Sequence, residues 1–430
     1  MASNLPHTHG DHAPFNVAIV GGGIVGLHVA LGLTKRGIPV TIYEQAHELK
    51  GIGAGMGFMS NIVGCMAAID PKIAESLDDI SVRSASKMRW IDGLAREDLR
   101  SRPKERLFDV ALGFDEEATT RATHRGYFLT ELVKLLPSNQ IKLGKRLDTI
   151  VQSGENEKLL FKFCDTTTAE TDAVIGCDGI KSCVRRLVLD DDDPAAVPHY
   201  AHETAYRCLV DMDKVLPVMG DLCKTMVIYM GQGAHLMAYP VDDFKSMNVA
   251  AFKNIQQAYS GFGPTVQSLA ALLPDELNCW AMFDTFDHPL PTYSYGRITL
   301  AGDAAHGSTP HYGSGAGMGV EDALVLSTVL QQAATKIRTH DVAVSKARVL
   351  SAAFEAYDAV RRERSQWLVR CSRRQGQKVK GLDQEIGKDF DKFKEHTKAN
   401  MDEIYYYDFR AMLQQATDEF EHRLSGSIRV

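Results

Sequence analysis

The chain has 430 residues, enough for two or three domains with a sizeable core. Hydrophobic residues make up 44% of it and charged residues 24%, as is ordinary for a soluble globular protein. The net charge of −7 indicates no nucleic-acid partner, and no apolar run approaches the roughly 18 residues of a membrane span.

Residues 1–14 are polar and lack the charged and apolar blocks of a signal peptide, so we expect a disordered tail. The eight cysteines are scattered and form no C-x-x-C pair. This distribution predicts neither a zinc site nor a disulfide framework, and it is typical of reduced thiols in an intracellular protein. We therefore expect no bound metal and a cytoplasmic location.

A glycine-rich turn follows the first apolar run, residues 17–20, which predicts a buried parallel strand. Gly21, Gly23 and Gly26 have the G-x-G-x-x-G spacing. In a dinucleotide-binding turn these glycines permit the tight turn, the approach of a pyrophosphate and the close packing of the next helix. The alternative is a glycine-rich turn that binds nothing, but three consecutive glycines are costly in backbone entropy.

Residues 24–36 predict the helix that follows the glycines, and residues 39–43 predict a second strand that ends at Glu44. An acid at this place accepts hydrogen bonds from ribose hydroxyls and repels a 2′-phosphate. The segment therefore favours the adenosine diphosphate group of FAD or NAD over that of NADP.

A second glycine cluster, residues 51–58, includes Gly57 and several apolar residues. These favour a second cofactor-contacting loop over a flexible surface loop. Arg125 begins a predicted helix, where a cation opposes the helix dipole. An anion nearby would explain Arg125, although a surface arginine fits the sequence equally well.

Two further strands end in acids. Residues 173–177 lead to Asp178, which is expected either to accept from a ribitol or ribose hydroxyl or only to cap the following turn. Residues 297–302 lead to Asp303, the best candidate for a second hydroxyl contact on the ribityl or phosphate side. His306 and His311 follow it, and both are interpreted as structural rather than as acid–base residues.

A glycine-rich helix start comes next, after Pro310. Its backbone N–H groups are expected to face a negative or electron-rich ligand. The residues concerned are Gly313, Gly315, Ala316 and Gly317.

Between residues 198 and 280, short alternating runs predict an antiparallel sheet distinct from the dinucleotide-binding fold. Arg207 and Tyr239 lie in mid-strand among apolar neighbours, although a mid-strand arginine most often faces solvent. Beyond Ser345 the pattern is helical, and the arginines of residues 347–374 are interpreted as solvent-facing.

Together, the Gly21-x-Gly23-x-x-Gly26 turn with Glu44, Asp178-Gly179, and Gly302-Asp303 with Pro310 resemble the class A flavoprotein monooxygenases of the para-hydroxybenzoate hydroxylase fold. The resemblance covers roughly residues 15–370. It implies that the first glycines and Glu44 hold the ADP part of FAD, that Arg125 lies near the flavin chain, and that Asp178 serves FAD and NAD(P)H. It further implies that Asp303 holds the ribityl chain, and that Pro310 and residues 313–317 lie against the isoalloxazine.

The fold implied by this family is α/β, with a Rossmann-like FAD-binding domain, an inserted antiparallel β-sheet substrate domain and C-terminal helices. We expect the FAD-binding domain to comprise residues 15–85, 115–190 and 290–345. The substrate domain would comprise residues 86–114 and 195–289, and the helical region residues 346–430.

A closer resemblance, to fungal phenol-dearomatising monooxygenases, covers nearly the whole chain. It rests on the segments Ala205-Tyr206-Arg207, residues 235–240, residues 281–285, and residues 407–409 with 412–414. Those enzymes act in azaphilone, tropolone, sorbicillinoid and asperfuranone-type polyketide pathways, and Arg207 and Tyr239 match the pair that holds their substrate as a phenolate. The resemblance implies a resorcylaldehyde-type substrate, FAD, NADPH or NADH as reductant, O₂ as co-substrate and a C4a-hydroperoxyflavin.

Whether the product is dearomatised depends on which ring carbon is attacked. A carbon that bears an alkyl group cannot lose a proton to restore aromaticity, whereas a carbon that bears hydrogen gives an ordinary catechol-type product. The alternative is therefore a salicylate- or hydroxybenzoate-type hydroxylase of the same fold. A dinucleotide-binding regulatory protein is disfavoured because Glu44, Asp178 and Asp303 are all present, and a monomer or homodimer is expected.

Overall fold

The computed structural model describes residues 14–49, 55–84, 87–95, 107–111, 120–155, 157–190, 192–241, 244–252, 259–274, 278–339 and 344–426. Residues 1–13 of the predicted tail, and residues 51–54 of the second glycine cluster, lie outside these ranges. No helix within them is long and apolar enough to cross a membrane.

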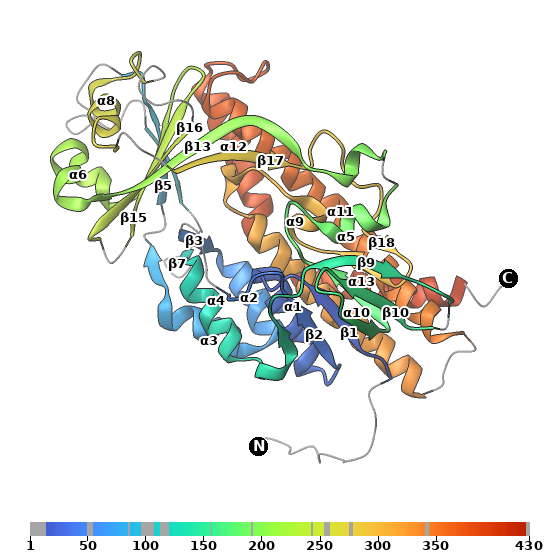
Figure 1. Ribbon diagram of the computed structural model, residues 1–430. Helices are drawn as coiled ribbons and strands as arrows, with labels where there is room; N and C mark the ends of the chain where they lie inside the picture. Colours follow the sequence, from blue (N-terminus) through green and yellow to red (C-terminus); the bar gives the residue numbers. More distant parts are fainter. Residues whose placement is uncertain are drawn as a thin grey trace, which may run out of the picture.

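A six-stranded sheet in the order β18-β19-β12-β1-β2-β8 organises the lower body in Figure 1. Its strands are β18 (Ser294–Tyr295), β19 (Ile298–Leu300), β12 (Ala173–Gly176), β1 (Val17–Val20), β2 (Val40–Tyr43) and β8 (Ile141–Lys142). All neighbours are parallel except β18 and β19. The carboxyl ends of β19, β12, β1 and β2 therefore meet at one edge of the sheet.

Two helices pack closely beside this sheet, α1 (Ile24–Lys35) and α10 (Gly315–Thr339). A Cβ on Gly32 of α1 would lie 2.1 Å from the Ser327 hydroxyl oxygen of α10, and a Cβ on Gly319 would lie 2.2 Å from Val25. Glycines thus allow the backbones of the two helices to approach each other, which fixes the start of α10 against the glycine-rich turn.

Other elements of the body complete its core. A meander of β9 (Leu147–Val151), β10 (Leu159–Phe163) and β11 (Thr168–Thr171) packs on Tyr43 through two aromatic contacts. A small sheet joins β3 (Gly55–Phe58), β7 (Thr120–His124) and β4 (Val82–Ser84). The remaining helices here are α2 (Ser60–Ile69), α3 (Pro71–Ile80), α4 (Arg125–Lys134), α5 (Cys183–Val188) and α9 (Asp303–His306).

A seven-stranded sheet forms the upper lobe, in the order β17-β13-β16-β15-β14-β5-β6 (Figure 1). Its strands are β17 (Asn278–Asp284), β13 (His199–Asp211), β16 (Ser246–Phe252), β15 (His235–Val241), β14 (Met226–Met230), β5 (Lys87–Asp92) and β6 (Leu107–Ala111). The antiparallel prediction holds except for β14 and β5, which are parallel because β5 comes from a distant part of the chain.

The two faces of this sheet have different partners. One face packs on α6 (Met212–Met219) and α8 (Pro264–Ala270) through side chains such as Val210, Leu236 and Val249. Side chains of the opposite face, including Trp90 and Ile228, join a core with α11 (Lys346–Val379) and α12 (Phe390–Tyr405). The face opposite α6 and α8 is called the inner face below. The last helix, α13 (Phe409–Gly426), packs on α10 and α11.

The prediction that the arginines of residues 347–374 face solvent is wrong for two of them. Arg361 and Arg364 in α11 are buried, and their guanidinium groups bind Glu321 and Asp322 of α10. The acids lie about forty residues before the arginines, so the pairing requires the tertiary packing of α10 on α11. A buried charge is tolerated here because each guanidinium is paired and hydrogen-bonded.

Candidate functional site

The three glycines of the first turn are glycine for different reasons. Gly21 has a φ of 104°, and a Cβ on it would lie 2.5 Å from the carbonyl oxygen of Cys177. A Cβ on Gly26 would lie 2.1 Å from the carbonyl oxygen of Gly21. Gly23 is the N-cap of α1, its backbone is extended, and a Cβ there would meet no atom of the described residues within 4 Å. Packing explains Gly21 and Gly26, whereas the open space at Gly23 fits the predicted approach of a ligand to the backbone, which stays a prediction.

Glu44 stands at the carboxyl end of β2, beside this turn. One of its carboxylate oxygens accepts a hydrogen bond from the Gly22 N–H at 2.7 Å, and the other accepts from the Ala46 N–H at 2.8 Å. These bonds fix the carboxylate while each oxygen keeps a second lone pair for a ligand hydroxyl. This geometry fits the ribose contact that the sequence predicts.

Asp303 follows β19 at the same edge of the sheet, as the first residue of α9. Burial among protein atoms raises the pKa of its carboxyl group, against the opposing influence of His306, Arg125 and Arg185. Its side chain is nonetheless exposed to solvent. Arg125, at the start of α4, is close enough for its charge to influence this carboxyl group.

The second glycine cluster and the start of α10 meet. Gly57, Gly313 and Gly317 line one small cavity, together with Ile62 of α2. Gly313 has a φ of 62° and lies two residues before Gly315, which begins the first turn of α10 together with Ala316. Pro310 begins the 3₁₀ turn Pro310–Tyr312 and is exposed. These predicted cofactor contacts therefore come from two parts of the chain that lie side by side.

Asp178 has a structural task in the absence of any ligand. Its carboxylate accepts hydrogen bonds from the Ser182 hydroxyl at 2.6 Å and from the backbone N–H groups of Cys183 and Val184. Burial raises the pKa of this carboxyl group, and the same hydrogen bonds oppose the rise. The turn-cap interpretation therefore has direct support, and the cofactor contact stays a prediction.

A buried charge network holds Asp303 and its helix in place. The Asp322 carboxylate accepts from the Gly302 N–H at 2.9 Å and lies 2.6 Å from Nε2 of His306. Its other oxygen accepts from Nε of Arg361 at 2.8 Å. Burial acts to raise the pKa of Asp322, but His306 and Arg361 outweigh it and the pKa is lowered. His306 is thus structural, as the sequence predicts.

Arg207 and Tyr239 both lie on the inner face of the seven-stranded sheet. Arg207 is paired with Ala250, and Tyr239 with Asn248, two positions along the same strand β16. Two strand spacings of about 4.8 Å separate their strands, and the small Ala250 between them lets two long side chains converge. Burial raises the pKa of Tyr239, and the charge of Arg207 opposes that rise, so the two groups are electrostatic neighbours.

Two buried side-chain donors beside Tyr239 on this face have no hydrogen-bond partner among the described residues. They are Nε of Arg207 and Nδ2 of Asn248. Buried polar groups are normally hydrogen-bonded, and the exceptions commonly mark a place where a ligand binds. Asn248 was not predicted from the sequence; its only signal is an amide within the apolar strand β16.

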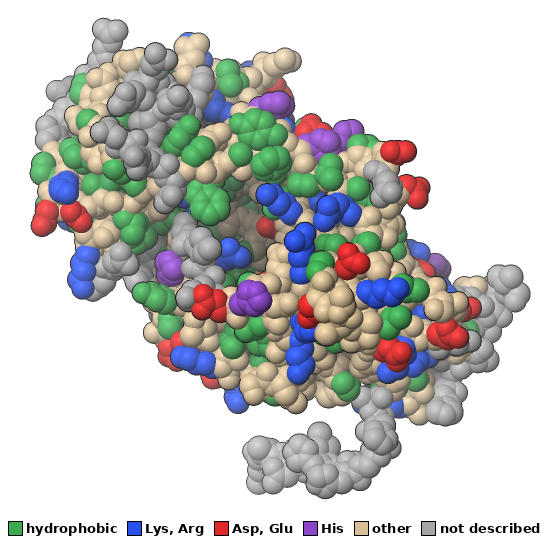
Figure 2. Space-filling model, in the orientation of Figure 1, with side chains coloured by type: hydrophobic (Ala, Val, Ile, Leu, Met, Phe, Trp, Pro, Cys, Tyr) green, Lys and Arg blue, Asp and Glu red, His purple; other side chains and the backbone are tan. Residues whose placement is uncertain are grey.

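The inner face also meets the body at Tyr239. A Cβ on Gly55 of β3 would lie 3.4 Å from the Tyr239 hydroxyl oxygen, so this tyrosine lies over the backbone beside Gly57. Figure 2 shows a hollow where the upper lobe meets the lower body. The structure thus brings the candidate substrate residues close to the second glycine cluster of the candidate cofactor site.

Comparisons with known proteins show the family of this chain. A family model described as FAD dependent oxidoreductase matches residues 16–104, and one described as FAD binding domain matches residues 270–355. FAD-dependent monooxygenase orf3 of Aspergillus niger is 41% identical, over 95% of this chain and 98% of its own. The chain belongs to the FAD-dependent monooxygenases. FAD-dependent monooxygenase pigN of Monascus ruber is also 41% identical, over 98% of this chain and 100% of its own.

Salicylate hydroxylase asL1 of Sarocladium schorii is 36% identical to this flavin monooxygenase, over 96% of this chain and 92% of its own. Among solved structures, a salicylate hydroxylase substrate complex has a TM-score of 0.78 and 27% identity, covering 94% of this chain and 98% of the other. These likenesses confirm the predicted family, its fold and an FAD-dependent enzyme. The glycine turn, Glu44 and the start of α10 fit FAD, and which side chains contact it stays a prediction.

Proposed function

We propose that this monooxygenase hydroxylates a phenolic, resorcylaldehyde-type polyketide with oxidative dearomatisation. The overall reaction consumes the phenol, NAD(P)H, a proton and O₂, and releases the hydroxylated product, NAD(P)⁺ and water. FAD, when bound, supplies the oxygen atom in an electrophilic form. The observation that carries the proposal is the pair Arg207 and Tyr239 on the inner face, with a buried guanidinium nitrogen that has no hydrogen-bond partner in the described part of the chain.

These two residues would activate the ring. A phenol has an unperturbed pKa near ~10, taking tyrosine as the model, and is a poor nucleophile while neutral. The guanidinium of Arg207 is always cationic, so it favours the phenolate, and the hydroxyl of Tyr239 donates to the same oxygen. The Asn248 amide is a further donor on this face for a second oxygen of the substrate. An electron-rich phenolate ring then attacks the electrophilic oxygen, which must lie near the ring carbon that reacts.

Relatives support the reaction class and one alternative substrate. This chain is equally similar, at 41% identity, to enzymes named FAD-dependent monooxygenases of Aspergillus niger and Monascus ruber and, at lower identity, to one named salicylate hydroxylase. The second candidate function is therefore hydroxylation of a salicylate-type ring with aromaticity kept. We further propose that the enzyme is cytoplasmic, uses NADPH as reductant, and is a monomer or homodimer.

The role of Arg207 is tested by replacing it. We expect Arg207→Ala to retain FAD and to lose most turnover of 2,4-dihydroxy-3,6-dimethylbenzaldehyde, because the phenolate loses its counter-charge. Turnover by this variant should recover as pH rises toward the pKa of the substrate, and Arg207→Lys should recover only part of it since the planar donor fork is lost. Arg370→Ala, which removes an exposed arginine of α11, is the matched control. Turnover of Arg207→Ala at the wild-type rate across this pH range would remove Arg207 from the mechanism.

A further inference from the structure

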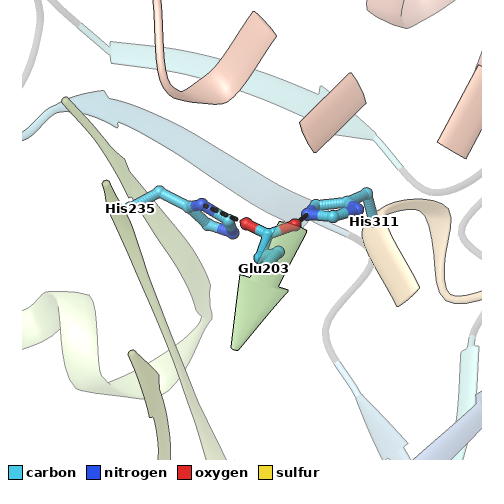
Figure 3. A group of neighbouring side chains, drawn as sticks. All are labelled: Glu203, His235 and His311. Atoms are coloured by element: carbon cyan, nitrogen blue, oxygen red, sulfur yellow. Dashed lines mark ion pairs between the residues drawn. The ribbon is translucent and has the colours of Figure 1, made fainter. Parts of the chain in front are cut away.

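A buried cluster of charged and aromatic side chains joins the seven-stranded sheet, called the substrate sheet below, to the turn that begins at Pro310 (Figure 3). Glu203 of β13 lies 3.1 Å from Nε2 of His311 through one carboxylate oxygen. Its other oxygen lies 3.1 Å from the ammonium of Lys380 and 3.9 Å from Nδ1 of His235. The carboxylate, which belongs to β13, thus lies beside β15, the C-terminus of α11 and the turn at once.

The ligand atoms of Glu203, His235 and His311 all lie within 4.8 Å of one another, a spacing that a divalent cation can bridge. Lys380 argues against a cation at this place. Its ammonium already neutralises the carboxylate, and a metal ion would stand beside a fixed positive charge. The cluster is better explained as a device that holds its members in position.

Glu203 is held in its charged form. Burial acts to raise its pKa, but His311, His235 and Lys380 outweigh burial and lower the pKa to about 2. Burial, with the nearby His311, lowers the pKa of His235 well below its ordinary value, so His235 is neutral near pH 7. A charged carboxylate in the protein interior fixes the donors around it strongly, because leaving it unpaired would be costly.

The ring of His311 is enclosed on its other sides. Nδ1 lies 3.0 Å from the Thr309 hydroxyl, and the ring centroid lies 5.7 Å from that of Phe252. A Cβ on Gly376 of α11 would lie only 2.6 Å from Cε1 of His311. The ring is therefore held by contacts on several sides, and its position is tied to that of the Pro310–Tyr312 turn, to which it belongs.

We propose that Glu203 is a positioning residue: through His311 it fixes the Pro310–Tyr312 turn and thereby the placement of the flavin ring relative to the substrate sheet. The inference rests on the proposed function, since it takes this turn as the one that faces the isoalloxazine. It gives a role to Glu203, His311 and Lys380, none of which is among the proposed substrate-binding or cofactor-binding residues.

Glu203→Gln is the direct test, because it removes the charge and keeps the shape. The holoenzyme is compared with Asp172→Asn, which removes another buried carboxylate that pairs with a lysine, at the far side of the body. The readouts are the visible circular dichroism of bound FAD, the hydrogen peroxide formed per NADPH, and product from 2,4-dihydroxy-3,6-dimethylbenzaldehyde. We expect Glu203→Gln to change the dichroism, to raise the peroxide yield and to lower product formation by ~10- to 100-fold, as for a misplacement of about 1 Å.

Gly376→Ala tests the same step from the other side of the ring. Alanine favours a helix over glycine by about 1 kcal/mol, so a purely structural effect would leave α11 at least as stable. The added methyl group must displace His311, so we expect a changed flavin dichroism and a higher peroxide yield. We expect the free energy of unfolding in urea to stay near the wild-type value.

The outcomes separate this inference from the proposed function. If Glu203→Gln and Gly376→Ala share the flavin dichroism and peroxide yield of the wild type, positioning through His311 is wrong while the reaction stands. If Asp172→Asn gives the same changes as Glu203→Gln, the effect is a general loss of stability and the inference again fails. A wild-type protein that binds no FAD would instead overturn the proposed function.

Discussion

Gly23→Ala should separate FAD binding from folding. Its N-cap backbone is extended, which alanine adopts freely, and an added Cβ would meet no atom of the described part of the chain within 4 Å. The lower preference for alanine at an N-cap and the smaller entropy of its unfolded chain are opposed effects of about 1 kcal/mol or less. The apoprotein should therefore unfold in urea with nearly the wild-type free energy.

The methyl group would instead stand where the pyrophosphate approaches the backbone. If the resulting overpacking costs about 1–3 kcal/mol, the dissociation constant of FAD rises by ~5- to 150-fold. Gly26→Ala is the contrasting variant, since its Cβ would lie 2.1 Å from the Gly21 carbonyl oxygen and should reduce apoprotein stability as well as FAD affinity. Titration of each apoprotein with FAD, followed by flavin fluorescence, measures the dissociation constant of FAD for both variants. Wild-type affinity in Gly23→Ala would refute the pyrophosphate assignment.

Two further predictions concern buried groups of the body. Asp322→Ala should lower the free energy of unfolding in urea by about 3–5 kcal/mol, because Arg361 stays charged and loses one of its carboxylate partners. The control Glu363→Ala, on the surface, should change this free energy by less than about 0.5 kcal/mol. Equal losses in the two variants would contradict the stabilising role of the buried charge network. Burial lowers the pKa of His28 from 6.5 to about 4, so the unfolded chain takes up a proton below pH 6.5 that the folded chain does not. Stability should thus be lost as pH falls, by about 2 kcal/mol between pH 7 and 5 from His28 alone. His28→Leu should lack this share of the pH dependence, and an unchanged pH profile would show that His28 is not the cause.

The glycine-rich turn could be predicted from the sequence because its physics is local. A strand, a turn that needs a positive φ at Gly21 and a helix that must pass close at Gly26 are all specified within ten residues. The same edge of the sheet collects Glu44, Asp178 and Asp303, because each follows a strand of one parallel sheet. Spacing could not show that the Asp178 carboxylate is already engaged by the next helix start.

Contacts between segments distant in the chain could not be predicted from the sequence. An arginine-rich helix has the composition of a solvent-facing one, and only the packing of α10 on α11 shows that Arg361 and Arg364 are buried. The alternation along β13 gives Arg207 a face but does not say which face meets the body; the packing of α6 and α8 on the opposite side decides it. Glu203 and His311 lie on separate elements, so their contact has no local signal.

The most direct test of the proposed function is the product from 2,4-dihydroxy-3,6-dimethylbenzaldehyde, formed with NADPH, O₂ and the FAD-loaded protein. Mass spectrometry reports the oxygen gained, and ultraviolet absorbance reports the ring. We predict a gain of one oxygen atom with loss of the aromatic chromophore. A gain of one oxygen with the aromatic chromophore kept would contradict dearomatisation and favour the salicylate-type alternative.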